Sequence, residues 1–432
     1  MVQRSRISTG RGARSSKDGD LIAAIDIGSS RAVCLIAYLI PTADGEWAPE
    51  IIGVGRQGGA LRERGASHSF SAEVALRGAV EAAEKLAGER IRGVYAAIGG
   101  RSLHCRRVGV DLDVEGGRVT REDIADCLRQ GVRAAAPEGY RMIHALPIGY
   151  SVDGEEMGTD PIGLAGGVLS AEILGVGVRE SQIANLESIA ERCALRIEEI
   201  TAAPYAAGEA VLLEDEKELG VVLIDIGAAS TDYAVYERGA LIDCGGVPVG
   251  GDHITRDIAQ IFGAPIKFAE RVKTLYGSAL VGAGDEHKLV DIEQIGEARD
   301  IVRVSRAEIS AVIAPRLEEI FELVEKRMPA DASARHRVRR VVLTGGGSLL
   351  VGARETAERV LGLKARLGRP SPLAGAPDAA TSPQFSVCAG LIQLAAKNKS
   401  GDRAAHGAPA PHFGAIGGGV IASVGQWLRQ NF

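Results

Sequence analysis

Two hydrophobic runs of the same design open the two halves of the chain. The first reads IAAIDIGSSRAVCLIAY over 22–38, and the second reads VVLIDIGAASTDYAVY over 221–236. In each, an apolar run rich in β-branched residues meets Asp-Ile-Gly, two small residues and a second β-rich run. Apolar runs that are this short and this rich in β-branched residues favour strands over helices. The pattern predicts two hairpins of one design, and their repetition predicts two related α/β domains that face each other.

Strand-like and helix-like segments alternate between the two hairpins. A helical pattern covers 71–88, with Ser71 as N-cap and Gly88 as stop signal. Thr120 and Asp123 have the spacing of a capping box, which predicts another helix. The other predicted elements are strands at 93–100, 141–154 and 169–178 and a helix with Ile183, Leu186 and Ile189 on one face.

The second hairpin is followed by helices and a third glycine-rich turn. Short helices are predicted at 250–263 and 266–277, and a long amphipathic helix at 304–328 that Pro315 interrupts. Residues 339–362 read as a strand, the turn TGGGS and a helix. A final packed helix is predicted at 383–398, before a stretch rich in Gly, Ala and Pro that lacks periodicity and reads as a flexible linker.

Composition narrows the class of protein. The 432 residues are 46% hydrophobic and 25% charged, which is typical of a globular protein with a sizeable core. The net charge of -6 gives no reason to expect a nucleic acid partner. The six cysteines are scattered without a CxxC pair, which favours reduced thiols and argues against structural zinc. Residues 1–20 read as a disordered basic arm, and no apolar run has the length of a membrane span.

The repeated hairpins suggest a nucleotide held between the two halves. Asp26 and Asp225 end buried strands directly before the turns, where their carboxylates would hold hydrated Mg²⁺ from opposite walls. The turns themselves would cradle phosphates with backbone N–H groups and hydroxyls. The candidate cradle residues are Gly28, Ser29, Ser30 and Arg31 in the first turn and Gly227, Ala228, Ala229, Ser230 and Thr231 in the second. The alternative is that each aspartate merely caps its own turn.

Two further elements would contact the adenosine. Gly345, Gly346, Gly347 and Ser348 lie between a strand and a helix, where a base or ribose can approach the backbone. Glu270 and Lys273 are three residues apart and share one helix face, from which they would grip the ribose and the ring. The alternative for this pair is a solvated salt bridge.

In this order the elements resemble the actin-like ATPase superfamily, which binds ATP between two domains. The segments EKELGVVLIDIG, GGDHITRDIA, AERVKTLYGSAL, IHALPIGYSVDG and DPIGLAGGVLSAEIL are similar to those of the bacterial FtsA family. The likeness runs through 21–396 and includes the tail. It implies an α/β, duplicated ribonuclease H-like fold of two domains, in which an inserted subdomain 1C, of the SHS2 type, replaces actin subdomain IB. It also adds Gly250 and Gly251 to the nucleotide site.

The resemblance sets expected domain limits along the chain. These are domain IA at 21–87 and 169–218, subdomain 1C at 88–168, domain IIA at 219–251 and 336–396, subdomain IIB at 252–335, a linker at 397–414 and a terminal helix at 415–432.

It also implies a function: an ATP- and Mg²⁺-binding protein that polymerises and tethers the ring of FtsZ, the tubulin-like division protein. The C-terminal peptide of FtsZ would dock on subdomain IIB, where Arg316 matches a basic position of the family and Arg306 is a second candidate. Later division proteins would bind through 1C. Two alternatives stay open, a PilM-like adaptor of pilus assembly and an enzyme of the same fold, such as a sugar kinase or chaperone ATPase.

The C-terminal residues have the pattern of an amphipathic helix. Apolar side chains recur at helical spacing with Trp and Phe among them, and polar residues occupy the other face. The apolar positions are Ile416, Val420, Ile421, Val424, Trp427, Leu428 and Phe432. Such a helix lies on an anionic membrane surface without spanning it. The expected location is the cytoplasmic face of the bacterial inner membrane at the division septum.

Hydrolysis is the weakest part of the expected function. Glu209 is the only acid in PYAAGEAVL, the segment in which this fold often positions the attacking water. ATP is therefore expected to act mainly in structure and polymerisation, with slow turnover or none. Ala228 and Ala229 replace the glycines common at these positions, so either both adopt negative φ or the turn is strained.

Overall fold

The computed structural model describes residues 19–58, 68–158, 160–296, 300–329 and 338–401. The basic arm up to residue 18 and the predicted membrane helix at 415–432 lie outside this range, as does the predicted linker from residue 402 onward. In the described part of the chain, no helix is long and apolar enough to cross a bilayer.

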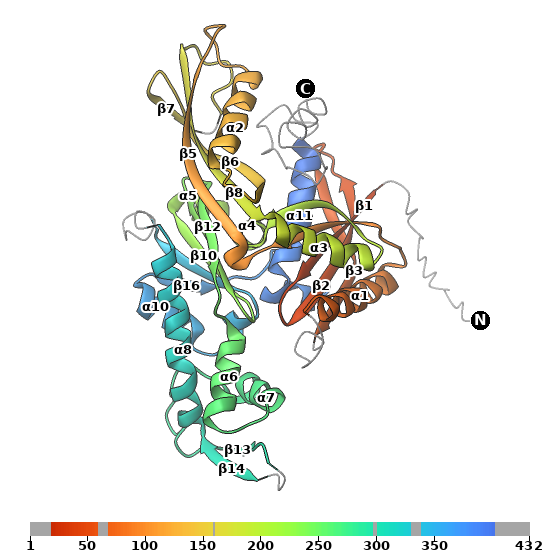
Figure 1. Cartoon of the computed structure of the whole chain (residues 1–432), viewed down its shortest axis with the longest axis vertical. Coiled ribbons are helices and arrows are strands. Elements are labelled where there is room, and N and C mark those ends of the chain that lie inside the picture. Colours follow the sequence, from red (N-terminus) through yellow and green to blue (C-terminus); the bar gives the residue numbers. More distant parts are fainter. Residues whose placement is uncertain (1–18, 59–67, 159, 297–299, 330–337, 402–432) are drawn as a thin grey trace, which may run out of the picture.

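Two five-stranded sheets of the same topology form the body of the molecule (Figure 1). In each, three antiparallel strands are followed by two that run parallel to the first. The first sheet has the order β3(Trp47–Gly58), β2(Arg31–Pro41), β1(Asp20–Ile27), β4(Gly93–Ile98), β9(Arg196–Ala202). The second has the order β12(Ala240–Val247), β11(Thr231–Glu237), β10(Val221–Ile226), β15(Arg340–Thr344), β16(Lys364–Leu367). The duplication and the two hairpins predicted from the sequence are confirmed.

Before the aspartate near its C-terminal end, each central strand carries a continuous apolar run, because both of its faces are buried there. On β10, Val221 and Leu223 face the core shared with the first half, whereas Val222 and Ile224 face the core of the second half. The alternation has the period of two expected for a strand.

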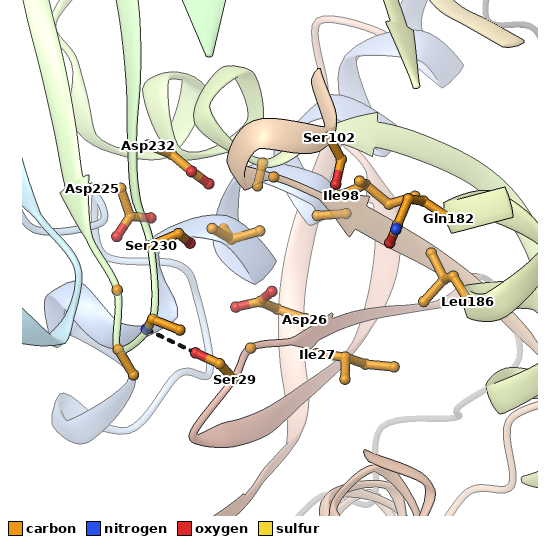
Figure 2. Close-up of a pocket in the computed structure, with 18 of the residues that line it drawn as sticks. Asp26, Ile27, Ser29, Ile98, Ser102, Gln182, Leu186, Asp225, Ser230 and Asp232 are labelled. Carbon is orange, nitrogen blue, oxygen red and sulfur yellow. Dashed lines mark hydrogen bonds between the residues drawn. The ribbon is translucent and has the colours of Figure 1, made fainter. Parts of the chain in front are cut away.

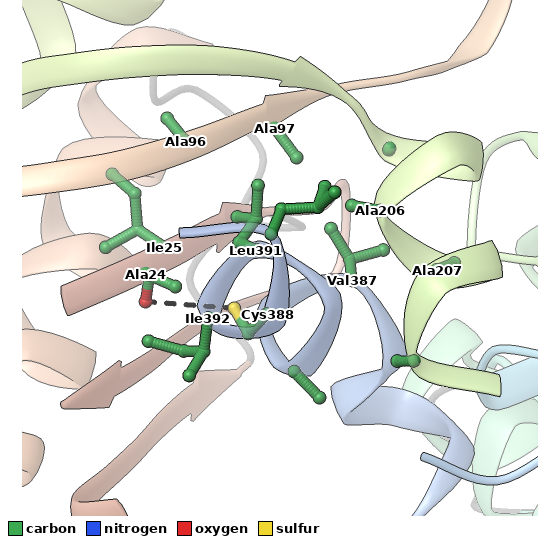
Figure 3. Close-up of a cluster of buried hydrophobic side chains, with 14 of the residues drawn as sticks. Ala24, Ile25, Ala96, Ala97, Ala206, Ala207, Val387, Cys388, Leu391 and Ile392 are labelled. Atoms are coloured by element: carbon green, nitrogen blue, oxygen red, sulfur yellow. Dashed lines mark hydrogen bonds between the residues drawn. The ribbon is translucent and has the colours of Figure 1, made fainter. Parts of the chain in front are cut away.

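Helices α4(Ala203–Val211) and α11(Ser386–Gly401) pack between the two sheets (Figure 3). They approach so closely that a Cβ on Gly390 would lie 1.6 Å from the carbonyl oxygen of Ala206. Cys388 and Ile392 of α11 pack against β1. Residues 386–396 therefore belong to the first half rather than to domain IIA, and the helix continues to Gly401, past the expected linker start at residue 397.

The chain between β4 and α3(Glu180–Arg192) forms an inserted subdomain. Its antiparallel sheet has the order β5(Leu103–Asp113), β8(Val168–Arg179), β6(Tyr140–Val152), β7(Glu155–Gly158), covered by α2(Arg121–Ala135). The predicted limits of 88–168 are corrected at both ends, since β4 belongs to the first sheet and β8 to the inserted one. The predicted capping box of Thr120 and Asp123 begins α2.

Of the remaining helices, the first covers the first sheet, and the others cover the second sheet and one end of the molecule. They are α1(His68–Ala87) in the first half, α5(Glu214–Leu219), α6(Gly251–Ile261), α7(Ile266–Tyr276), α8(Arg306–Arg327) and α10(Ala353–Leu361), with the hairpin β13(Leu289–Glu293), β14(Ile301–Ser305). The predicted interruption at Pro315 is wrong, because α8 continues through it. Its buried face, which includes Ile313, Leu317 and Phe321, offsets the backbone hydrogen bond that proline cannot donate.

The contact between α4 and α11 generates a stability prediction. Replacing Gly390 by Ala should lower the free energy of unfolding by about 1–3 kcal/mol, because the methyl group collides with the backbone of Ala206. Helix propensity alone would favour Ala. The matched control is Gly78→Ala on α1, which meets only the side chain of Gln57 and should be neutral or stabilising. Urea unfolding measures both, and equal midpoints for the two variants would refute the close packing.

Candidate functional site

The two hairpin turns lie on opposite walls of a cavity of about 350 Å³, called here the central cavity. The end of β1 with Gly28 and Ser29 lines one wall, and the end of β10 with turn 227–230 lines the other. Helix α3 and the segment after β4 line the remaining side. Eight of the predicted site residues line it: Asp26, Gly28, Ser29, Asp225, Gly227, Ala228, Ala229 and Ser230.

The two turns are built alike and touch each other. Each begins with the same hydrogen bond, from Gly28 N to Arg31 O and from Gly227 N to Ser230 O, both 2.9 Å. The N–H of Ala229 donates to Ser29 Oγ across the cavity at 2.9 Å (Figure 2). Neither Ala228 nor Ala229 has a positive φ, so the unstrained alternative holds. Gly227 is required sterically, since a Cβ there would lie 2.8 Å from Ser230 O.

The second turn also caps helix α6. The N–H groups of Gly251 and Asp252 donate to the carbonyl oxygens of Gly227 and Ala228 at 3.0 and 2.8 Å. A Cβ on Gly250 would lie 2.7 Å from Gly227 O. The structure thus places Gly250 and Gly251 behind the turn, where they fix its position, and not on the cavity wall.

The third glycine-rich turn lies against both hairpins. Gly345 has φ +78°, and a Cβ there would lie 2.0 Å from Asp225 Oδ1. A Cβ on Gly346 would lie 2.5 Å from Arg31 Nη2, and one on Gly347 would lie 2.3 Å from the side chain of Ile226. Ser348 Oγ donates to Gly345 O at 2.7 Å. This turn is therefore brought to the site, although none of its residues lines the central cavity.

Three carboxylates share the cavity. Asp225 and Asp232 are directly opposite each other in the β10–β11 register, and Asp26 comes from the facing hairpin (Figure 2). Burial raises the pKa of Asp26 to about 6, of Asp225 to about 7 and of Asp232 to about 8, and the neighbouring carboxylates add to the rise for Asp225 and Asp232. Like charges opposite each other in a sheet are unfavourable. The arrangement favours a proton or a cation between them.

Arg31 lies beside these carboxylates without neutralising them fully. Burial is the main cause that lowers its pKa, and Asp26 and Asp225 are among the charges that oppose this shift. Its Nη1 is buried and has no hydrogen-bond partner among the residues that the structure describes. A buried guanidinium donor next to two turns that can each surround a phosphate group favours the binding of an anion.

The carboxylates of the cavity suit a hydrated Mg²⁺ ion. No group of three or more His, Cys, Asp or Glu side chains in the described ranges is arranged to bind a metal ion directly. Mg²⁺ keeps several waters and needs only one or two carboxylates. Asp26 and Asp225, on facing walls, are suited to that role.

Several other predicted residues are held in internal contacts. Lys273 Nζ pairs with Glu270 Oε2 at 2.8 Å and donates to Gly251 O at 2.9 Å, which holds the pair against the start of helix α6. Thr231 Oγ1 donates to Val249 O at 2.8 Å and is buried. With Ser30, these residues do not line the central cavity.

Glu209 does not reach the cavity either. It pairs with Lys217 at 2.8 Å and Lys397 at 2.6 Å, and its side chain is 8% exposed. These lysines lower its pKa against the opposing effect of burial. Glu209 thus joins α4, α5 and α11, and the cavity wall at the start of α4 is Ala203.

The predicted peptide-binding arginines both lie on α8. Arg316 is bound by Asp257 at 2.6 and 3.0 Å and also contacts Glu319. Arg306 begins the helix, 4.0 Å from Asp285. Both side chains keep about a third of their surface exposed, at 28% and 32%.

Part of the cavity wall was not predicted from the sequence. Asp232 accepts a 2.7 Å hydrogen bond from Gly100 N, which joins the second hairpin to the base of the inserted subdomain. The hairpin register was a usable signal, since a four-residue turn after Ile226 pairs Asp225 with Asp232. Gln182 and Asn185 of α3 also line the cavity, beside Leu186 and Ile189 from the predicted apolar face of this helix.

Comparison with solved structures supports the same fold. The PilM–PilN type IV pilus biogenesis complex matches with a TM-score of 0.61 at 17% identity, covering 86% of this chain and 97% of that one. MreB5 of Spiroplasma citri bound to ADP matches with a TM-score of 0.50 at 14% identity, covering 89% and 98%. The molecule therefore has the actin-like ATPase fold with an inserted subdomain. At these identities the PilM alternative is supported by fold alone.

Sequence comparison is more specific. The model of "Cell division protein FtsA" matches residues 222–390, and that of "SHS2 domain inserted in FTSA" matches 100–176, in agreement with the observed limits of the inserted sheet. Cell division protein FtsA of Agrobacterium fabrum is 36% identical over 97% of this chain and 96% of its own length. The Rhizobium meliloti protein is 34% identical over 96% of both, and that of Escherichia coli is 28% identical over 96% and 97%. The chain belongs to the FtsA family of cell division proteins.

The buried carboxylates predict an unusual pH dependence. A carboxyl group whose pKa is higher in the folded chain binds protons more tightly when folded, so stability falls as pH rises through about 4 to 8. Asp232→Asn keeps an acceptor for Gly100 N but removes the charge. In EDTA, its melting temperature should exceed that of the parent chain increasingly from about pH 4 to 8, and the difference should level off above pH 8.

Thermal unfolding across this pH series measures the difference. Asp291→Asn, which removes an exposed carboxylate paired with Arg303, is the control and should follow the parent curve. A constant offset between Asp232→Asn and the parent chain at every pH would contradict the raised pKa.

Proposed function

We propose that this chain binds ATP with Mg²⁺ in the central cavity and links FtsZ to the cytoplasmic membrane surface during division. The observation that carries the proposal is the pair of matching turns that meet at Ser29 and Ala229 over buried carboxylates. Membership of the FtsA family and the ADP bound to the fold neighbour MreB5 support it.

In this proposal each wall supplies one part of the phosphate site. Backbone N–H groups of the turns and the hydroxyls of Ser29 and Ser230 would bind phosphate oxygens, and Arg31 would add positive charge. Asp26 and Asp225 would hold hydrated Mg²⁺, whose charge offsets phosphates and carboxylates together. The adenosine would lie towards Gly345–Ser348 and the Glu270–Lys273 pair, outside the central cavity.

Turnover would be slow or absent. The wall at the start of α4 is Ala203, which cannot activate water, and Glu209 is fixed by two lysines. General base catalysis requires a group within hydrogen-bond reach of the attacking water. Nucleotide would then act mainly by holding the two halves together, which favours assembly of the chain into filaments.

The two ends of the tether lie in different parts of the chain. Arg316 and Arg306 are ten residues apart on α8, or about 15 Å, so they would contact different positions of one FtsZ C-terminal peptide. Residues 415–432 would bind an anionic bilayer at the division septum as an amphipathic helix. The inserted subdomain would remain available to later division proteins.

Co-sedimentation of FtsZ with anionic liposomes tests both ends in one experiment. The intact chain with ATP and Mg²⁺ should carry FtsZ into the pellet. Deletion of 415–432 should leave both proteins in the supernatant. Arg316→Glu should leave this chain on the liposomes but reduce pelleted FtsZ severalfold, because the charge at the docking surface is reversed.

The matched control is Asp257→Asn, which keeps Arg316 but removes its partner, and it should retain FtsZ in the pellet. FtsZ that pellets equally with Arg316→Glu would refute the docking site. Liposome binding that survives the deletion would refute the membrane helix.

A further inference from the structure

Two cysteines meet where the inserted subdomain touches the second half. Cys105 lies on β5 and Cys244 on β12, and their sulfur atoms are 3.1 Å apart. Both are free thiols. The nucleotide site and the proposed tether use neither residue, and no other pair of thiols in the described ranges is in such contact.

One face of β12 forms this junction. Side chains two residues apart on a strand lie on the same face, so Cys244 and Gly246 face the inserted subdomain together. A Cβ on Gly246 would lie 2.8 Å from the backbone of Gly100 and 2.4 Å from Asp232 Oδ1. The thiol pair therefore adjoins the Gly100–Asp232 hydrogen bond, which connects the inserted subdomain to the central cavity.

The two thiols differ in accessibility. Cys105 is partly exposed, whereas Cys244 is 2% exposed. The hydrogen bond with Cys105, together with burial, raises the pKa of Cys244 well above its ordinary value. An oxidant in solution would thus reach Cys105 first and Cys244 only through it. This is the arrangement of an attacked thiol with a resolving thiol beside it.

We propose that Cys105 and Cys244 form a reversible disulfide under peroxide-class oxidants, which locks the inserted subdomain against the second half. Cys105 thiolate attacks the O–O bond of the peroxide, takes one oxygen as sulfenic acid and releases the other as water after proton uptake. The sulfur of Cys244 then attacks the Cys105 sulfur, the S–S bond forms and the S–O bond breaks, releasing a second water. Two thiols lose two electrons and two protons, and the peroxide is reduced to two waters.

Little movement is needed for this bond. The sulfur atoms must approach from 3.1 Å to about 2 Å, which small rotations of the two side chains can supply. The bond would close a loop of about 140 residues that contains most of the inserted subdomain and the second hairpin. It would restrict rotation of the inserted subdomain about its base beside Asp232.

Thiol counting on the native full-length chain tests the proposal. After treatment with hydrogen peroxide, denaturation and alkylation, intact mass should show four alkylated thiols instead of six, restored to six by dithiothreitol. Peptide mapping should find the peptides of Cys105 and Cys244 linked. Hydrogen exchange in β5 and β12 should slow in the oxidised chain and recover on reduction.

Variants separate this bond from general oxidation. Cys105→Ser should keep all five remaining thiols at the same peroxide dose, because Cys244 is shielded. Cys193→Ser, which removes another partly exposed thiol, should still lose two thiols to the link. Oxidised Cys105 without the linked peptide, or links between separate chains only, would overturn the proposal. The peptide map of the parent chain decides it even if a variant fails to fold.

Discussion

The structure depends on an electrostatic constraint: three carboxylates are held around one cavity between two halves of the chain. Asp225 and Asp232 oppose each other across the second hairpin, and Asp26 faces them from the first. Burial and mutual repulsion favour their neutral forms, so bound positive charge would stabilise the ionised site. The turns, the buried donor of Arg31 and the hydroxyl of Ser29 surround this charge with groups that suit phosphate. The proposed nucleotide with its Mg²⁺ would supply both the positive charge that the carboxylates favour and the phosphates that the surrounding groups suit.

The backbone brings these groups together through close approach and repetition. Two sheets of identical order present equivalent hairpins, and α4 and α11 pack closely against each other between these sheets. Gly345 and Gly250 allow neighbouring backbone to press against the second hairpin from two sides. Asp232 extends the network to the inserted subdomain through Gly100 N. A structural change at the central cavity can therefore reach the inserted subdomain through this hydrogen bond. The Cys105–Cys244 pair lies at the same junction between the inserted subdomain and the second half.

Much of this was predictable from the sequence. Local patterns predicted both hairpins, most helices and the eight residues that now line two walls of the cavity, because strand and turn signals are local. Domain limits were less accessible: β8 and α11 have apolar patterns that suit more than one sheet, and only tertiary packing assigns them. The hydrogen bonds and ion pairs of individual side chains were not predictable, as those of Thr231 and Glu209 show. The third wall, with Gln182, depends on how α3 is placed after an insertion of some 80 residues.

Calorimetric titration of ATP into the full-length chain, with Mg²⁺ and with EDTA, tests the central claim most directly. The account predicts that Mg²⁺ strengthens binding and that Asp225→Asn loses this Mg²⁺-dependent gain by about 10- to 100-fold while remaining folded. Asp291→Asn, far from the cavity, should retain it. Equal dependence on Mg²⁺ in all three proteins, or no binding of ATP by the folded parent chain, would contradict the account.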